Sequence, residues 1–170
     1  MSRISRQKLA LSGIDMDQLG DEGMARIIRD IIDAGLHGLA FSPYVDGQDN
    51  TFEVDADQIR SRLGVLAPHV DWVRTFSCTR GNELTPAIAR EMGLNSMVGV
   101  WIDDDLARNE IELAKGIEIA QRGDADILGI GNEVLLREEL TEDQLIEYIN
   151  RAKASVDVPV GYVDAYFLFE

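Results

Sequence analysis

The feature that most constrains this chain is a regular alternation of short apolar runs with segments of helical spacing. Five runs rich in β-branched, aromatic or small residues predict strands at 37–41, 72–76, 96–101, 127–131 and 158–163. Successive starts are separated by 24 to 35 residues, which is the length of a strand, a crossover helix and their turns. Because such long crossovers join parallel strands, the spacing predicts a parallel α/β sheet.

The intervening segments carry apolar residues three and four positions apart, as amphipathic helices do. These stripes lie at 24–31, 59–66 and 84–92, at Ile111, Ala114 and Ile117, and at 145–152. Thr141 followed by Gln144 predicts a capping box at the start of the last helix. Gly35, Gly93 and Gly123 stand where three of the helices are expected to end.

Two architectures fit this spacing. A five-stranded doubly wound sheet of the flavodoxin or receiver type fits a length of 170 residues. A (β/α)8 TIM barrel fits the strand ends better, but it needs about 250 residues. Since the apolar end at 167–170 follows the fifth strand directly, we expect residues 1–170 to be one barrel-type domain that is incomplete at its C-terminus. Residues 1–35 are interpreted as an N-terminal extension with one amphipathic helix.

Composition excludes several classes of function. The formal net charge is −15, with 16 basic and 31 acidic residues, so nucleic acids and anionic membranes are poor partners. No apolar run is as long as a membrane span and no signal peptide is recognisable, so a cytoplasmic location is predicted. His37 and His69 have no partners at metal-ligand spacing, and Cys78 is a lone cysteine. Val134 replaces the third glycine of a dinucleotide fingerprint, so neither a metal nor a cofactor is expected.

Polar and aromatic residues gather at the expected carboxyl ends of the strands, where α/β proteins bind ligands. Carboxylates and amides bind hydroxyl groups, and aromatic faces cover pyranose rings, so these residues favour sugar recognition. The candidate binding residues are Tyr44, Asp46, Arg74, Glu83, Trp101, Asn132, Asp164 and Tyr166. Six of them also have a structural interpretation: core for the three aromatic residues, an ion pair for Arg74, a turn for Asp46 and a helix start for Glu83.

Glu133 is the candidate for catalysis. It follows the run at 127–131 almost directly, with Asn132 before it. A carboxyl group at such a position, partly desolvated by aromatic neighbours, is able to act as a general acid. A structural interpretation stays open at this point, because an acidic residue at a helix start also favours the helix dipole.

Five segments of the sequence together resemble bacterial members of glycoside hydrolase family 17, which comprises β-1,3-glucanases and some glucan transglycosylases. The segments are HGLAFSPYVDGQ, WVRTFSCTRGNEL, MVGVWI, ILGIGNEVLLR and VPVGYVDAY, in the order of the family over roughly residues 36–170. The resemblance implies a (β/α)8 barrel that acts on β-glucan by a retaining mechanism with two glutamates. The acid/base of the family follows an asparagine at the end of the fourth strand, which corresponds to Glu133 after Asn132.

The nucleophile of the family lies at the end of the seventh strand, in a Glu-Thr-Gly-Trp-like segment. This chain contains no such segment, so the resemblance implies that the nucleophile and three barrel strands are absent. Because a retaining glycosidase needs two carboxyl groups about 5–5.5 Å apart, we expect the chain to be inactive alone or to act with a second copy or a complementing chain. A barrel fragment that binds carbohydrate without cleaving it, and the doubly wound domain, are the alternatives.

Overall fold

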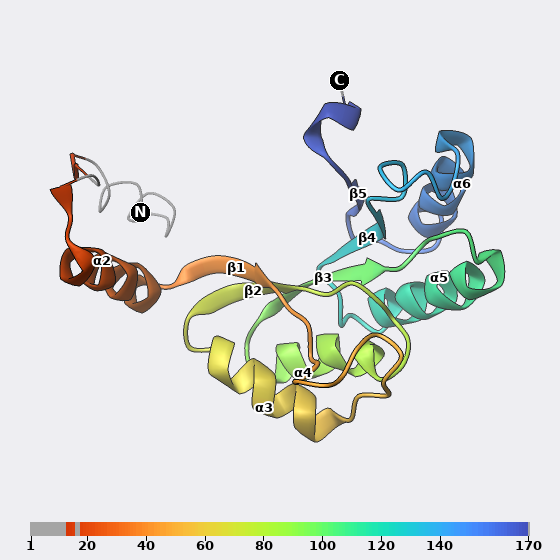
Figure 1. Ribbon diagram of the computed structural model, residues 1–170. Helices are drawn as coiled ribbons and strands as arrows, with labels where there is room; N and C mark the ends of the chain where they lie inside the picture. The colour runs from red at the N-terminus through yellow and green to blue at the C-terminus, as the bar shows by residue number, and fades with distance from the viewer. Residues whose placement is uncertain (1–12, 16–17, 170) are drawn as a thin grey trace.

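The computed structural model describes residues 13–15 and 18–169, which form an α/β structure around one five-stranded sheet (Figure 1). The strands are β1 (Leu36–Ala40), β2 (Val70–Arg74), β3 (Asn95–Val100), β4 (Ile127–Asn132) and β5 (Val160–Val163). Each strand pairs in parallel with the next, in the order β1-β2-β3-β4-β5. All five predicted strands are confirmed, with starts displaced by no more than two residues.

Helices occupy the expected connections. They are α2 (Asp21–Ala34), α3 (Ala56–Leu66), α4 (Thr85–Glu91), α5 (Leu106–Gln121) and α6 (Glu142–Lys153), with short 3-10 helices η2 (Asn82–Leu84) and η3 (Tyr166–Phe169). The predicted capping box at the start of α6 is confirmed, because Thr141 and Gln144 exchange side-chain and backbone hydrogen bonds. The predicted ends of α2, α4 and α5 are confirmed within two residues of their glycines.

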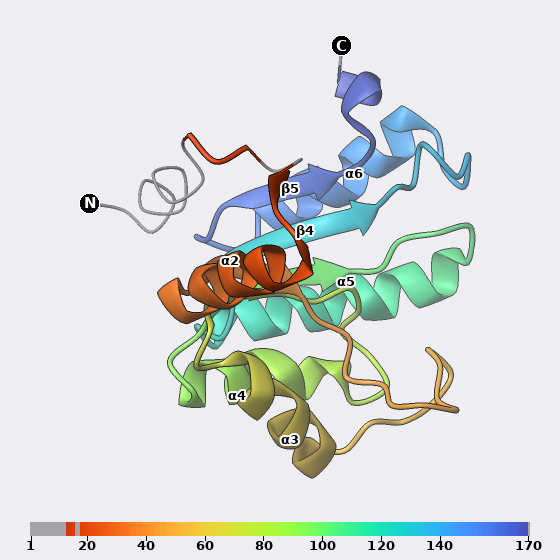
Figure 2. The same ribbon diagram turned by 60° about the vertical axis from the view of Figure 1, so that its left-hand side comes forward.

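The sequential strand order decides between the two architectures. Flavodoxin-like sheets have the order 2-1-3-4-5 and carry helices on both faces. Here β1 lies at an edge, and helices α3 to α6 lie on one side of the sheet (Figures 1 and 2). The doubly wound alternative is therefore wrong. Right-handed crossovers that always step in the same direction place their helices on one face and curve the sheet toward a barrel.

The core lies between the sheet and these helices, in two clusters. One joins β4 to α5 and α6 through Leu128, Leu113 and Leu145, and the other joins β2 to α3 through Val73 and Ile59. These five side chains are at most 2% exposed. Burial of each such side chain stabilises the fold by about 1.5–3 kcal/mol, which anchors the strands whose carboxyl ends carry the candidate site.

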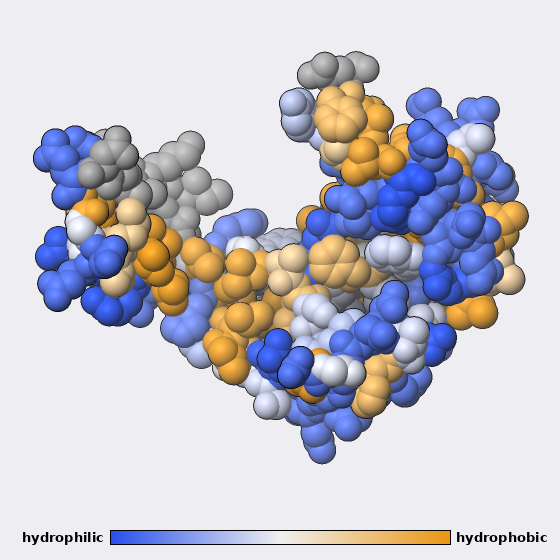
Figure 3. Space-filling view, viewed as in Figure 1, coloured by the Kyte–Doolittle hydropathy of each residue, from blue (hydrophilic) through white to orange (hydrophobic). Residues whose placement is uncertain are grey.

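The opposite face of the sheet is open and apolar. Leu39 on β1 is 40% exposed, and a hollow of about 370 Å³ on this face has Trp72, Met97 and Ile127 in its lining. Figure 3 shows apolar side chains between α2 and the middle of the molecule. In a closed (β/α)8 barrel this face is packed with side chains from all eight strands.

Helix α2 forms where the stripe of apolar residues predicted a helix. Its residues are all exposed or half-buried, and Ile28 and Ile32 on it are 50% and 37% exposed. The division of the chain into an extension and a barrel-type domain stays a prediction, part of which falls on residues outside the described ones. Within residues 13–15 and 18–169, every helix is too short or too polar to cross a membrane.

Candidate active site

Glu133 stands at the carboxyl end of β4, where the strand loses its regular geometry. The pairing of β4 with β5 shifts register between Gly129 and Asn132, and Gly131 has a φ of +82°. A Cβ atom at position 131 would lie 2.8 Å from Cγ2 of Val134, so both the conformation and the space call for glycine. Such a bulge turns the following side chains to a new direction.

Glu133 itself has a φ of +55°, a left-handed conformation that costs a non-glycine residue about 1–2 kcal/mol. Its N–H donates to the carbonyl of Val163 at 2.8 Å, and its carbonyl accepts from the N–H of Arg137 at 2.9 Å. Its side chain is exposed, and in the part of the chain that the structure describes its carboxylate has no hydrogen-bond partner. The helix-start interpretation is wrong, because Glu133 lies in a bend that leads into a turn at 134–138, and the next helix, α6, begins only at Glu142.

Two arginines flank this carboxylate. Arg74, the last residue of β2, donates from Nη2 to Oδ1 of Asn132, so it binds an amide instead of forming the ion pair considered for it. Arg137 donates to the carbonyl of Asn132 and to Oε2 of Glu139 at 2.6 Å. Burial lowers the pKa of Arg74, which the charge of Glu133 partly offsets, and the hydrogen bond to Glu139 raises the pKa of Arg137. Glu133 therefore lies near two permanent cations.

Asp164 holds the turn that carries Glu133. Its Oδ2 accepts the N–H groups of Leu135 at 3.2 Å and Leu136 at 3.4 Å, and the hydroxyl of Tyr162. Burial opposes ionisation of Asp164, but these hydrogen bonds together lower its pKa. Burial and the hydrogen bond to Asp164 raise the pKa of Tyr162 to about 12. Its Oδ1 accepts the N–H of Ala165 at 2.7 Å, so both oxygens of this candidate binding residue are engaged by the protein itself.

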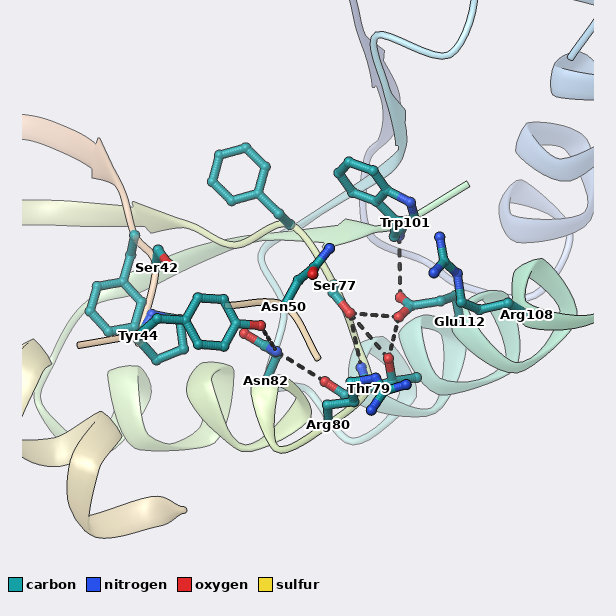
Figure 4. Close-up of a pocket in the computed structure, with 13 residues that line it drawn as sticks. Ser42, Tyr44, Asn50, Ser77, Thr79, Arg80, Asn82, Trp101, Arg108 and Glu112 are labelled. Atoms are coloured by element: carbon teal, nitrogen blue, oxygen red, sulfur yellow. Dashed lines mark hydrogen bonds between the residues drawn. The ribbon is translucent and has the colours of Figure 1, made fainter. Parts of the chain in front are cut away.

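A second polar region lies at the carboxyl ends of β1, β2 and β3. A pocket of about 120 Å³ opens there (Figure 4). Its lining consists of Phe41, Ser42, Pro43, Tyr44, Asn50, Phe76, Ser77, Thr79, Arg80, Asn82, Trp101, Arg108 and Glu112. Tyr44 and Trp101 are the predicted binding residues that the structure brings together here, and the other lining residues were not among the candidates.

Glu112, on α5, lies beneath this pocket and is 1% exposed. Its Oε1 accepts the hydroxyls of Ser77 at 2.5 Å and Thr79 at 2.6 Å. Its Oε2 accepts the N–H groups of Cys78 at 2.7 Å and Trp101 at 3.2 Å. Four donors compensate the burial of the charge. Burial, together with the charge of Glu112, raises the pKa of the Cys78 thiol.

Trp101 joins the pocket to the turn of Glu133. Its indole Nε1 donates to Oδ2 of Asp103 at 2.9 Å, and the Arg137 guanidinium lies 4.7 Å from the ring centroid, a cation–π distance. Asp103 also pairs with Arg108 and is 7% exposed. Asp103 is thus a buried, paired carboxylate, whereas Asp105 is exposed and caps α5.

Three predicted binding residues line neither region. Asp46 is exposed in a turn with Gly47, and Tyr166 in η3 is 81% exposed. Glu83 lies in η2 beside the pocket residue Asn82, and its Oε2 is buried without a hydrogen-bond partner among the described residues. Their roles in binding stay predictions. Within residues 13–15 and 18–169, no cluster of acidic, histidine or cysteine side chains is arranged to hold a metal ion.

The sequence pattern does not identify Glu112, because the apolar stripe predicts the wrong face of α5 to be buried. Ile111 in the predicted stripe is 56% exposed. The buried residues are Asn109, Glu112, Leu113, Gly116, Ile119 and Ala120, which also follow a spacing of three and four. A charged residue within such a stripe is the signal that could have identified Glu112, because buried charges require dedicated partners.

Comparison with known proteins gives one family match. The BtgE/BtgC glycoside hydrolase domain family matches residues 38–169. A glucan 1,3-beta-glucosidase of Schizosaccharomyces pombe is 29% identical over 163 residues, covering 88% of this chain and 50% of the relative. A glucan 1,3-beta-glucosidase of Candida albicans is 30% identical over 151 residues, covering 78% of this chain and 48% of the relative.

Two solved structures are similar to this chain as well. The glycoside hydrolase family 17 beta-1,3-glucanosyltransferase of Rhizomucor miehei superposes with a TM-score of 0.67 and 25% identity, covering 79% of this chain and 51% of that one. An active-site mutant of the same enzyme, in complex with laminaritriose, gives the same values. The chain therefore spans about half the length of the proteins that it matches.

Proposed function

This chain belongs to the BtgE/BtgC glycoside hydrolase domain family, and from that premise we propose that it provides the acid/base half of an enzyme that cleaves or transfers β-1,3-glucan. The resemblance to glycoside hydrolase family 17 and the barrel type of the fold are confirmed by the glucanosyltransferase neighbour. The observation that carries the proposal is the place of Glu133, an exposed carboxylate that follows Asn132 at the carboxyl end of β4.

In the proposed retaining mechanism, Glu133 protonates the glycosidic oxygen as the bond breaks, and it then activates water or an acceptor sugar. Asn132 orients the substrate. Because Arg74 donates to Oδ1 of the Asn132 amide, the nitrogen of that amide points elsewhere and keeps its two hydrogens for sugar hydroxyls. The two arginines near Glu133 hold the turn while the carboxylate itself stays free of hydrogen bonds from the described residues.

We place the nucleophile outside this chain. The family resemblance assigns it to the seventh barrel strand, and the described sheet has five strands. Asp164 and Glu83 are the nearest substitutes in the sequence, but Asp164 accepts hydrogen bonds from the turn of Glu133 and Glu83 lies in η2, beyond the end of β2. The second carboxylate therefore comes from further barrel strands, a second copy or a complementing chain.

The pocket at the ends of β1 to β3 supplies the binding part of the proposal. Tyr44 and Trp101 offer aromatic surface, and Ser77, Thr79 and Asn82 offer polar atoms. This combination suits a glucosyl unit. The glucanosyltransferase neighbour has been crystallised with laminaritriose, a glucose trimer, which makes that trimer the natural probe.

The test is the release of reducing ends and the formation of transfer products from soluble β-1,3-glucan by this chain. Glu133→Gln is assayed beside it, with Glu138→Gln as the matched control, because Glu138 is exposed in the same turn and also has a positive φ of 56°. Loss of activity in Glu133→Gln alone supports Glu133 as the acid/base and places the nucleophile within this chain or a partner copy. Equal and measurable activity in all three proteins contradicts the role of Glu133.

A second candidate function is carbohydrate binding without cleavage. It is favoured by one observation: the pocket at the ends of β1 to β3 is formed by residues of this chain alone. Calorimetric titration with laminaritriose distinguishes it. Binding that Glu133→Gln leaves unchanged, in a protein that never cleaves the trimer, identifies a binding module.

A further inference from the structure

We infer that Glu112, almost fully buried beneath the pocket, sets the hydrogen-bonding polarity of its wall, so that Ser77 and Thr79 present only acceptors to a ligand. Glu112 is thus a specificity-determining positioning residue that acts through two hydroxyl groups. The inference rests on the proposed function for the identity of the ligand, a glucosyl unit. The polarity of the wall follows from the hydrogen-bond geometry alone.

The argument begins with what each partner is able to do. The N–H groups of Cys78 and Trp101 can only donate, so Oε2 of Glu112 must accept. Oε1 lies 2.5 Å from the Ser77 hydroxyl and 2.6 Å from the Thr79 hydroxyl. A buried carboxylate needs donors on both oxygens. Since a hydroxyl group has one proton, Ser77 and Thr79 each direct that proton to Glu112, and neither proton is left for the 3.2 Å contact between the two hydroxyl oxygens. Oγ of Ser77 also accepts the N–H of Thr79 at 3.2 Å, so one lone pair of Ser77 and those of Thr79 remain for a ligand.

Asn82 and Tyr44 complete the wall by the same reasoning (Figure 4). Nδ2 of Asn82 lies 3.0 Å from the carbonyl of Thr79 and 3.0 Å from the Tyr44 hydroxyl oxygen. Because a carbonyl only accepts, the nitrogen must be on this side of the amide, and both of its hydrogens are engaged. Asn82 is left with an acceptor oxygen, and Tyr44 keeps its phenolic proton for donation.

Of the uncharged polar side chains that line the pocket, Ser77, Thr79 and Asn82 therefore present acceptors and Tyr44 presents a donor, while Ser42 and Asn50 are able to do either. A ligand matches it when it carries neighbouring groups that donate hydrogen bonds. Free sugar hydroxyls do so, whereas a fluorine, keto or ether group in the same place leaves a wall acceptor unpaired. A site built to bind a hydroxyl rejects ligands that lack it. The pocket thus selects an unsubstituted glucosyl unit.

Glu112→Gln is the decisive variant, because it reverses this polarity at nearly constant shape. The two backbone N–H groups require the amide oxygen of the new side chain at the Oε2 position. Its NH2 group then faces Ser77 and Thr79 and donates to their oxygens. Both hydroxyl protons are released. One is able to bridge the 3.2 Å between the two hydroxyl oxygens, and the other turns toward the pocket as a donor.

The first experiment determines, without any ligand, whether the hydroxyl protons of Ser77 and Thr79 are bound to Glu112. Proton NMR of the wild-type chain should show slowly exchanging, downfield hydroxyl protons on Ser77 and Thr79, as expected for hydrogen bonds to a buried carboxylate. Both signals should be lost in Glu112→Gln and kept in Glu118→Gln, the matched control, since Glu118 is an exposed residue of the same helix. Absence of both protected protons from the folded wild-type chain overturns the inference.

The second experiment reads specificity. Calorimetry compares methyl laminaribioside with derivatives in which one hydroxyl at a time is replaced by fluorine, which cannot donate a hydrogen bond. At least one derivative should bind the wild-type chain about tenfold more weakly, the value of one hydrogen bond, and that penalty should shrink in Glu112→Gln. An unchanged penalty in the variant contradicts the inference.

If Glu112→Gln fails to fold, Thr79→Val provides the test. It removes one acceptor from the wall and keeps the hydrogen bond from the Ser77 hydroxyl to Glu112. In a double-mutant cycle, Thr79→Val and one fluorine substitution should be non-additive; strict additivity for every position overturns the inference. If the wild-type chain shows the protected hydroxyl protons but binds no glucan, the proposed function fails while the polarity of the wall stands.

Discussion

Two glutamates near the carboxyl ends of neighbouring strands have opposite surroundings, although one lies in a helix and the other in a turn. Glu112 lies within the regular helix α5, is 1% exposed and accepts hydrogen bonds from four donors. Glu133 lies in a turn, is exposed, and has a left-handed φ of +55°. The difference agrees with the roles proposed for them: a buried charge with four donors serves the structure, whereas an exposed charge on a strained backbone is available for chemistry.

The two glutamates also differ in which of their groups form hydrogen bonds with the surrounding protein. Glu112 organises its surroundings, because the loop after β2 and the end of β3 both donate to it. Glu133 is organised by its surroundings, because Arg137, Asp164 and Val163 bind the backbone of its turn and leave its carboxylate alone. Removal of Glu112 should therefore disturb the fold, and removal of Glu133 should disturb the reaction.

The largest effect is expected for Glu133→Gln on catalysis. In a form of the protein that processes β-1,3-glucan, the rate should fall by about 10²- to 10⁴-fold, the usual value of a general acid/base. The free energy of unfolding should change by less than about 0.5 kcal/mol, as for other exposed side chains. Enzyme assay and urea denaturation measure the two quantities. A large loss of stability with an unchanged rate would show that Glu133 supports the fold and not the reaction.

Glu112→Ala should be the most destabilising change. It leaves the N–H groups of Cys78 and Trp101 and two hydroxyls without their acceptor, and each unpaired buried group costs about 1–3 kcal/mol. We expect a loss of about 3 kcal/mol or more in urea denaturation followed by circular dichroism. Glu118→Ala, on the exposed side of α5, is the control and should cost less than about 0.5 kcal/mol. Equal effects of the two substitutions would contradict the assigned role of Glu112.

Glu133→Gly compared with Glu133→Ala isolates the backbone strain. Both remove the same carboxylate, but only glycine adopts a φ of +55° without a steric penalty. The glycine variant should be more stable than the alanine variant by about 1 kcal/mol. In the regular helix at position 112 the order should reverse, with alanine more stable by about 1 kcal/mol. Thermal and urea denaturation of the four variants test the crossed pattern.

The smallest effect is a pH dependence at the support of the Glu133 turn. The pKa of Tyr162 is raised to about 12 by burial and by Asp164, whereas an unfolded tyrosine titrates near about 10. The stabilising contribution of the Tyr162 hydroxyl is thus fully present below pH of about 10 and is lost as the pH rises toward about 12. The difference in urea midpoint between wild type and Tyr162→Phe should shrink over this interval. A constant difference would show that the hydroxyl titrates alike in both states.

The arrangement at β4 could be read from the sequence because its determinants are local. The apolar run at 127–131 fixes a strand, the next residues are Asn132 and Glu133, and the carboxyl ends of parallel strands face the ligand side. The turn itself could not be read in this way. It depends on Gly131 at a φ of +82° and on hydrogen bonds that the turn donates to Asp164, which follows β5 about 28 residues further along the chain.

The sequence by itself determined the strands, the parallel sheet and the place of Glu133, since period, spacing and turn residues act over short distances. Tertiary structure alone decided the order of the strands, the buried face of α5 and the wall of the pocket. The face of α5 is set by a close approach to β3, where a Cβ on Gly116 would lie 2.3 Å from Cγ2 of Val100. That contact turns Glu112 inward to side chains more than 30 residues away, and no local pattern encodes which distant donors will meet a buried charge.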